Sequence, residues 1–390
     1  MVQVASLFNQ LLKHFPRTEF ASLVQKHGAE RRAKGFTCWT QFVAMLFCQL
    51  SRTDSLREIC NGLSCCLGKL IHLGVNRAPQ RSTLSYANQH RPAALFEDLF
   101  QSALNRFREQ QLFGARRTRF RFKNKLLSLD STTISLCLSL FPWAQFKRAK
   151  GGVKAHVLLD HDDYMPRFVL LTDAKATDVR MARAMPIPSQ SIVTCDRAYM
   201  DFPRFAQWTE QDIYFVCRLP SSPLYSVVSE NPVPARGKIL SDQIVQFTGR
   251  YSGQCRYPLR RITLRIDGDD EPLTLITNLL HFAATTIAGI YKERWQIEVF
   301  FKTLKQNLKI KTFVGTTENA LRIQIWTALI AMLLLRWLHH LSKARWSLSN
   351  LASMLRLNLF TYRDLQAWLD DPFATPPLEP QPDQLKLEFA

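Results

Sequence analysis

The chain has 390 residues, a formal net charge of +19 and a hydrophobic content of 46%. A chain of this length can bury a large core in two or three domains, and its dispersed Gly and Pro exclude collagen-like, low-complexity and largely disordered proteins. Residues 1–125 hold 20 Lys and Arg against 7 Asp and Glu, a net +13, whereas residues 126–390 carry +6. This asymmetry favours a nucleic-acid partner, with an ordinary basic surface as the alternative.

The nine cysteines form no CxxC pair and no Cys/His zinc spacing. We therefore expect reduced core thiols in a cytosolic protein. The most apolar run, Ile325 to Leu335, lies between two arginines and is too short to span a bilayer. It predicts a buried helix, and we expect no signal peptide, no membrane contact and a cytoplasmic location.

Helical spacing of apolar residues dominates from Phe36 to about Leu112 and predicts an all-α N-terminal domain over residues 1–120. Within it, residues 78–91 have the composition of a DNA-recognition helix, with Ser82 as N-cap and with Arg81 and Arg91 as DNA contacts. An ordinary solvated helix explains the same spacing.

A basic stretch at residues 116–125, with two phenylalanines interleaved, follows this domain. It could clamp backbone phosphates or serve as a solvated linker. These two alternatives remain open from the sequence.

The hydrophobic period then changes to that of β-strands. Three strands, a helix, a strand, a helix and a strand are expected in that order at 126–136, 153–160, 167–173, 177–185, 191–195, 202–208 and 213–219. This order is that of a ribonuclease H-like α/β catalytic domain, which we place at residues 121–340. Short β-like pieces with Pro and Gly predict a β-rich insertion at about 220–280.

Helical spacing returns from Thr285 to about Leu341, and two amphipathic helices follow to Asp370. Residues 341–370 are therefore expected to form a helical C-terminal region, with a capping box from Thr361 to Asp364 before the last helix. Residues 371–390 hold 5 of the 19 prolines and several acids, which predicts a disordered or loosely packed tail.

Two aspartates stand where a sheet can bring them together. Asp130 lies inside the first apolar strand, where a charge is costly unless it is paired or coordinated, and Asp196 directly follows the strand at 191–195. The first and fourth strands of a ribonuclease H-like sheet are neighbours, so the two carboxylates should meet. Phosphodiester chemistry uses hard divalent cations held by shared carboxylates, two ions being ~4 Å apart.

The helix after residue 285 offers a third carboxylate. At ~100° per residue, with Tyr291 at zero, Arg294 falls near ~300°, Glu298 near ~340° and Lys305 near ~320°. These four side chains share one face, next to an apolar stripe of Ile290, Ile297, Phe301, Leu304 and Leu308. The spacing suits a metal-binding Glu flanked by phosphate-binding groups.

Each of these residues, considered alone, also has a purely structural explanation. Asp130 could be a hydrogen-bonded core residue, Asp196 a cap of the next turn, and the helix residues a salt-bridge ladder. The remaining acids of this region, Asp160, Asp162, Asp163, Asp173 and Asp178, lie at hairpin ends, and we assign them to turns and helix caps.

Taken together, the residues resemble the DDE transposases of bacterial insertion sequences, in the cut-and-paste group with a β-rich insertion before the final Glu. The resemblance covers most of the chain from about Arg32 to Arg336. It rests on residues 129–160, 170–179 and 193–202 and on the signature of Tyr, two residues, Arg, three residues, Glu, six residues and Lys, which ends at Lys305.

The resemblance implies that Asp130, Asp196 and Glu298 are catalytic and bind two Mg²⁺ ions, with Mn²⁺ as a substitute. It also implies that Tyr291, Arg294 and Lys305 hold phosphates at the transposon end. Arg197 and Lys154 are expected to face DNA or to stabilise the sheet. Trp295 is expected in the core, with stacking on an unpaired base as the alternative.

We therefore predict an enzyme that binds terminal inverted repeats, cleaves the DNA ends and joins the 3′-hydroxyl ends to target DNA. The resemblance suggests a hairpin on the ends, and two synapsed ends suggest a homodimer associated with the nucleoid through DNA. The alternatives are a metal-dependent DNA nuclease on the same fold and an inactive sequence-specific DNA-binding relic.

Overall fold

The structure is a computed structural model in which the chain divides into two compact units, residues 1–115 with 302–390 and residues 116–301. The described residues are 5–31, 33, 35–66, 68–113, 120–137, 139–147, 150–173, 178–183, 185–219, 224–233, 237–248, 253–266, 268, 271–307, 313–344 and 346–378. One unit is helical and the other carries a large sheet, which confirms the mixed α/β class.

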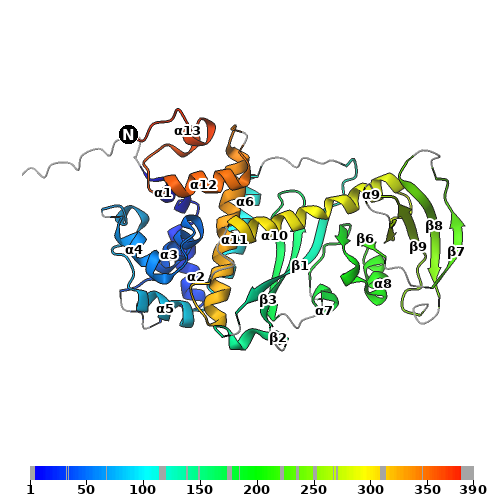
Figure 1. Ribbon diagram of the computed structural model, residues 1–390, viewed down its shortest axis with the longest axis horizontal. Helices are drawn as coiled ribbons and strands as arrows, with labels where there is room; N and C mark the ends of the chain where they lie inside the picture. Colours follow the sequence, from blue (N-terminus) through cyan, green and yellow to red (C-terminus); the bar gives the residue numbers. More distant parts are fainter. Residues whose placement is uncertain are drawn as a thin grey trace, which may run out of the picture. The chain divides into compact units, whose positions relative to one another are not determined.

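Among its described residues, the helical unit begins with six α-helices and one short 3₁₀ helix and ends with three further α-helices. They are α1 (Leu7–Leu12), α2 (Arg17–Lys26), α3 (Cys38–Ser51), α4 (Leu56–Ser64), η1 (Ile71–Leu73), α5 (Arg81–His90), α6 (Ala94–Glu109), α11 (Glu318–Leu341), α12 (Leu348–Asn358) and α13 (Leu365–Asp370). The α-helices are labelled in Figure 1.

Helix α11 is the centre of the helical unit. It is long and apolar enough to cross a membrane by length and composition, but 89% of its most apolar window is buried inside the protein. Helices α3, α5, α6 and α12 pack against it, as a helix that is apolar on all sides requires. The buried helix predicted around Ile325 is confirmed.

The N-terminal and C-terminal helices therefore form one unit. The amide of Asn319 on α11 donates to the carbonyls of Asn88 and Arg91, and its oxygen accepts from the Ala93 N–H. The structure divides the chain after Phe301, whereas the sequence suggested a boundary at residue 340. The difference arises because α11 packs against the N-terminal helices α3, α5 and α6 as well as against α12.

Two predicted helix caps are wrong. Helix α5 starts at Arg81 after Gln80, which makes no side-chain cap, so the Ser82 hydroxyl lies inside the first turn. Helix α13 is capped by Asp364, whose carboxylate accepts from the Ala367 N–H at 2.8 Å, while the Thr361 hydroxyl donates to the carbonyl of Asn358 at the end of α12.

The ends of two predicted loops lie partly outside the described residues, namely 116–119 of the basic connector and 379–390 of the tail. The described part of the tail is held by backbone contacts. The Thr375 N–H donates to Asp371 and the Leu378 N–H donates to Tyr362.

The other unit contains one sheet with ten described strands, in the order β2-β3-β1-β5-β6-β10-β9-β8-β7, with β4 paired to β3. They are β1 (Leu126–Leu136), β2 (Gln145–Lys147), β3 (Lys150–Asp160), β4 (Pro166–Asp173), β5 (Ile192–Cys195), β6 (Tyr214–Arg218), β7 (Tyr225–Glu230), β8 (Ile239–Phe247), β9 (Leu259–Leu264) and β10 (Leu273–Thr277). Figure 1 labels most of these strands. Short helices connect them: η2 (Pro142–Ala144), α7 (Asp178–Arg183), η3 (Arg197–Tyr199) and α8 (Phe202–Glu210).

Alternate residues of β1, β5 and β6 serve two cores on opposite faces of the sheet. Val193 and Phe215 pack with the aromatic side chains of α8, whereas Ile192 and Val216 pack with α9 (Ala284–Glu293). Residues at even positions of β1 and β5 therefore face α9. Polar side chains at even positions of β1 thus lie on the face of the sheet that α9 covers.

The predicted β-rich insertion consists of β7 to β10. These strands extend the central sheet, because β10 pairs antiparallel with β6. A buried ion pair holds them: Arg260 on β9 donates to both oxygens of Asp242 on β8, at 2.8 and 2.6 Å. The insertion thus shares the hydrophobic core of the central sheet.

Candidate active site

Parallel pairing of β1 with β5 brings the two predicted aspartates together. Leu129 lies opposite Cys195 in the register, Asp130 is the next residue of β1, and Asp196 directly follows β5. The expectation that the first and fourth predicted strands are neighbours is confirmed. Asp196 also caps η3, since its carboxylate accepts from the Ala198 N–H at 2.7 Å.

The predicted single helix after residue 285 is two helices, α9 and α10 (Trp295–Asn307), which meet at Arg294. The backbone bonds there span three residues: the Arg294 N–H donates to Tyr291, and the Ile297 N–H donates to Arg294. These bonds tighten the helix locally, while the backbone of Arg294 keeps helical angles of φ −51° and ψ −31°. The predicted apolar stripe is buried at Ile290, Ile297, Phe301 and Leu304, whereas Leu308 lies outside the described residues.

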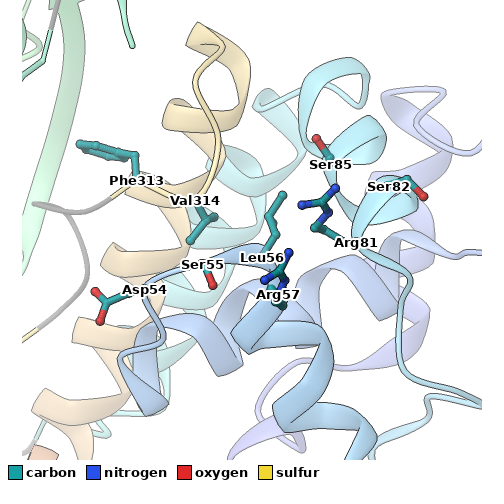
Figure 2. A pocket seen from close by; sticks show the side chains of 9 residues that line it. All are labelled: Asp54, Ser55, Leu56, Arg57, Arg81, Ser82, Ser85, Phe313 and Val314. Carbon is teal, nitrogen blue, oxygen red and sulfur yellow. The ribbon is translucent and has the colours of Figure 1, made fainter. Parts of the chain in front are cut away.

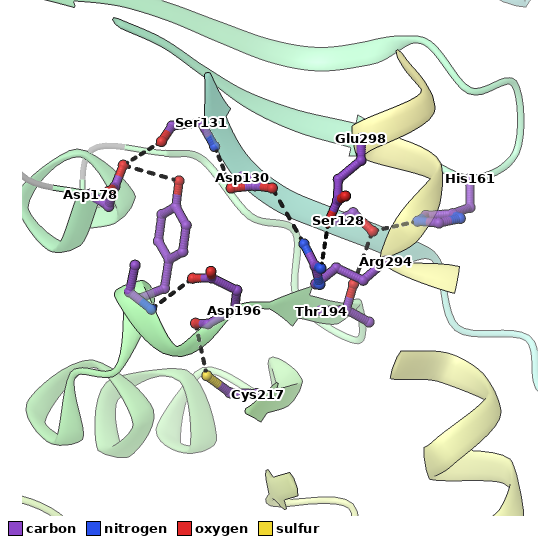
Figure 3. Close-up of polar contacts among 12 residues, drawn as sticks. Ser128, Asp130, Ser131, His161, Asp178, Thr194, Asp196, Cys217, Arg294 and Glu298 are labelled. Atoms are coloured by element: carbon purple, nitrogen blue, oxygen red, sulfur yellow. Dashed lines mark hydrogen bonds and ion pairs between the residues drawn. The ribbon is translucent and has the colours of Figure 1, made fainter. Parts of the chain in front are cut away.

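Arg294 links two of the three predicted carboxylates. One guanidinium nitrogen lies 2.6 Å from Glu298 Oε1 and another lies 3.4 Å from Asp130 Oδ2. Figure 3 shows this guanidinium between the two side chains, with Asp196 at the start of the turn that follows β5. The helices α9 and α10 thus deliver a cation and a carboxylate to the face of the sheet that carries both aspartates.

The electrostatics of the site follow from this arrangement. Burial raises the pKa of Asp130 to about 6, the Ser131 N–H and Arg294 lower it, and Asp196 and Glu298 raise it further. Burial also raises the pKa of Tyr291 to about 12, against the effect of Arg294. For Arg294, burial alone would lower the pKa, but Tyr291, Glu298 and Asp130 outweigh burial and keep the guanidinium charged.

Buried hydroxyl groups join β1 and β5 at Ser128 and Thr194, each of which stands two residues before an aspartate. The Ser128 hydroxyl lies 2.7 Å from His161 Nε2 and 2.9 Å from the Thr194 hydroxyl (Figure 3). Burial lowers the pKa of His161 to about 4, so the ring is neutral near pH 7. Sequence reasoning missed these residues, although the two-residue period of a strand places Ser128 on the face of Asp130.

Asp178, at the start of α7, has a role beyond the predicted helix cap, because it contacts the strands next to Asp130. Its carboxylate accepts hydrogen bonds from the hydroxyl of Ser131 at 2.6 Å, the ammonium of Lys154 at 2.7 Å and the hydroxyl of Tyr199 at 3.4 Å. Burial would raise its pKa, but bonds from His156, Lys154 and Ser131 outweigh burial and hold the pKa well below its ordinary value. No local sequence signal could reveal a contact of four separate segments.

The remaining predicted residues of the sheet unit are placed as follows. Lys154 is largely buried and bound to Asp178, which favours its sheet-stabilising alternative. Arg197 is exposed in η3, next to Asp196. Trp295 is 60% exposed, so the expectation of a core position is wrong: at ~100° per residue it falls near ~40°, well away from the buried stripe of Ile290 and Ile297.

Three predicted DNA contacts lie in the other unit or at its edge. Lys305 is on α10, two turns beyond Glu298. Arg81 is exposed at the start of α5. Arg91 donates to Gln41 Oε1 and to the carbonyl of Phe36, and it stacks on the Phe36 ring, so its present contacts are structural.

The carboxylates suit a hard divalent cation in their chemistry. Their oxygens are the ligand type that such a cation prefers. The pKa of Asp130 is raised by burial and by the negative charges of Asp196 and Glu298, and a bound cation would offset that repulsion. As the side chains stand, the described ranges contain no group of three or more His, Cys, Asp or Glu placed to hold one metal ion. Arg294 lies between Asp130 and Glu298 instead.

Comparisons with known proteins agree with the motifs. The transposase DDE domain family matches residues 121–334, and a domain of unknown function matches residues 3–76. The chain is 32% identical to transposase y4zB of Sinorhizobium fredii over 78% of this chain and 83% of that one. It is 33% identical to a transposase of insertion sequence element IS5377 of Geobacillus stearothermophilus, over 60% and 62%. The chain therefore belongs to the DDE transposases of bacterial insertion sequences.

A solved structure is also similar at a lower level. It is the synaptic complex of piggyBac transposase with hairpin DNA, at 11% identity and a TM-score of 0.45, covering 92% of this chain and 81% of that one.

Proposed function

We propose that this transposase binds the terminal inverted repeats of its insertion sequence, cleaves the DNA ends and joins their 3′-hydroxyl groups to target DNA. The observation that carries the proposal is the convergence of Asp130, Asp196 and Glu298 on one face of the sheet around Arg294. We assign the sheet to the ribonuclease H-like class on the strand order around β1 and β5.

Asp130, Asp196 and Glu298 would hold two Mg²⁺ ions, with Mn²⁺ as a substitute, and these would activate the attacking hydroxyl and stabilise the departing 3′ oxygen. Arg294 orients Glu298 and is placed to bind a phosphate beside it. Tyr291 and Lys305 would hold neighbouring phosphates, and exposed Arg197 is available to the strand near Asp196. These cationic groups would fix the scissile phosphodiester before the reaction.

The helical unit would supply sequence recognition, with α5 as the recognition helix and Arg81 as a DNA contact. Arg91 would then support α5 through its contacts to Phe36 and Gln41. Because both ends of an element must react together, a homodimer is the proposed active assembly. Exposed Trp295, next to Arg294, is available to stack on an unpaired base.

The test uses purified protein, labelled DNA that carries the element's ends and a supercoiled target, in Mg²⁺ and in EDTA. Glu298→Gln is the key variant, because Gln keeps an oxygen for Arg294 while removing the carboxylate charge. We expect end-specific cleavage and joined products with the wild type only, and unchanged end binding by the variant. Cleavage without joining would indicate a nuclease, and binding without cleavage a DNA-binding relic.

A further inference from the structure

A polar pocket of about 520 Å³ lies in the helical unit, where the first turns of α4 and α5 approach residues 313–314 (Figure 2). It does not involve the catalytic carboxylates. Its lining consists of Asp54, Ser55, Leu56, Arg57, Arg81, Ser82, Ser85, Phe313 and Val314.

Two guanidinium groups dominate the pocket. Arg57 and Arg81 are both exposed, and in the described part of the chain neither has a hydrogen-bond or ion-pair partner. Other arginines of the same unit are engaged, for example Arg106 with Glu19 and Arg322 with Glu318. Two cations that line one pocket repel each other, so an anion between them is favourable.

The neighbouring groups are compatible with an anion. The hydroxyls of Ser82 and Ser85 line the same pocket. Asp54 is the one carboxylate among the lining residues, and Figure 2 shows its side chain turned away from the two arginines. The first turn of α4 is satisfied internally by Ser55 and Glu58, so the arginines and not the helix end would bind the anion.

The anion is best supplied by a polymer, because the exposed surface continues along α5. At 3.6 residues per turn, Ser85 and Gln89 follow Arg81 in one row and Tyr86 and His90 follow Ser82 in the next. The rings of Tyr86 and His90 stack at 4.0 Å, and Tyr86 is 65% exposed. Side chains that can contact bases thus stand beside a pocket that can hold a phosphate.

We propose that the pocket formed by Arg57, Arg81, Ser82 and Ser85 binds a backbone phosphate of duplex DNA and so sets the position of α5 along the element's end. The inference rests on the DNA binding in the proposed function. A guanidinium pair matches the geometry of a phosphodiester, and each phosphate contact contributes to the salt dependence of binding.

The experiment measures binding of a labelled end duplex to the full chain by fluorescence anisotropy, in EDTA and over a range of salt concentrations. The double variant Arg57→Gln/Arg81→Gln should bind at least about tenfold more weakly, with a log–log salt slope lower by about 1 to 2. Arg322→Gln is the control: it makes the same substitution at one guanidinium, which is already paired with Glu318, and should change binding less than about twofold.

The double variant Arg57→Lys/Arg81→Lys keeps both positive charges and shows whether the two positions tolerate substitution. Its salt slope should be closer to that of the wild type than to that of the Gln double variant. Wild-type binding by the Gln double variant, with an unchanged slope, would overturn the pocket assignment while leaving the proposed function intact. Absence of end binding by the wild type would refute both. If inorganic phosphate binds the wild type but duplex binding is the same with and without both arginines, the pocket is a site for a free anion and the inference is overturned.

Discussion

Replacement of Asp178 by Asn tests whether the contacts beneath the carboxylates hold the active site together. Asn keeps an oxygen for the Ser131 hydroxyl but loses the charge that pairs with Lys154 at 2.7 Å. The two partners are 18% and 16% exposed, so the pair is mostly shielded from water.

The expected loss of stability can be worked out from these contacts. Removing one partner of a buried ion pair costs ~3–5 kcal/mol, and a hydrogen bond to a charged group contributes ~1.5–3 kcal/mol. Because both side chains retain some exposure, we expect about 2–3 kcal/mol for Asp178→Asn. Asp178→Ala should cost about 1 kcal/mol more, since Ser131 also loses its acceptor.

The sign of the pH dependence follows from the lowered pKa of Asp178. A carboxyl whose pKa is lower in the folded state contributes stability above its unfolded pKa of ~4, and this contribution is lost as the pH falls through the folded pKa. The difference between the wild type and Asp178→Asn should therefore be full at pH 7 and decrease below about pH 4.

The assay is urea unfolding at several pH values, with single-turnover cleavage measured in parallel at saturating DNA. Glu210→Gln is the control, because its partner Arg256 is 77% exposed and such surface pairs contribute less than ~1 kcal/mol. Displacement of Ser131 would also move Asp130, so cleavage should fall about 10- to 100-fold. A stability loss below about 0.5 kcal/mol, or unchanged cleavage, would refute the role of these contacts.

Three further changes probe other parts of the chain. Asp242→Asn leaves buried Arg260 without its charged partner and should cost ~3–5 kcal/mol in urea unfolding; a cost near that of a surface pair would contradict the buried contact. Gly74→Ala forces a side chain to φ +70°, 3.0 Å from an arginine nitrogen, and should lower stability by ~1–3 kcal/mol in thermal unfolding; an unchanged Tm would argue against that backbone. Lys305→Ala should weaken end binding and reduce the salt slope by about 1, and an identical slope would remove Lys305 from the phosphate contacts.

The positions of the strands and of the apolar helix could be predicted because they depend on local periodicity. The strands expected around Asp130 and before Asp196 are β1 and β5, and their neighbouring positions followed from the order of elements. The buried run inside α11 likewise followed from its composition. The four-residue spacing of Arg294 and Glu298 in the signature also made their ion pair predictable, because residues four apart on a helix are neighbours.

Other features depended on which segments meet in three dimensions. Thr361 was expected to cap α13, but its hydroxyl closes the end of α12. Asp178 had the local context of a turn residue, and only the folded sheet brings it to Ser131 and Lys154.

The sequence by itself determined the family of the chain and most strand and helix segments of its sheet unit, and it predicted the three carboxylates as a site, because these are expressed in residue type and short-range spacing. Only the tertiary structure decided how each charge is satisfied: Arg294 between Asp130 and Glu298, and Arg57 with Arg81 left open in one pocket. The physical reason is that the partner of a charge is set by packing between distant segments, whereas a strand or helix is set largely by its own residues.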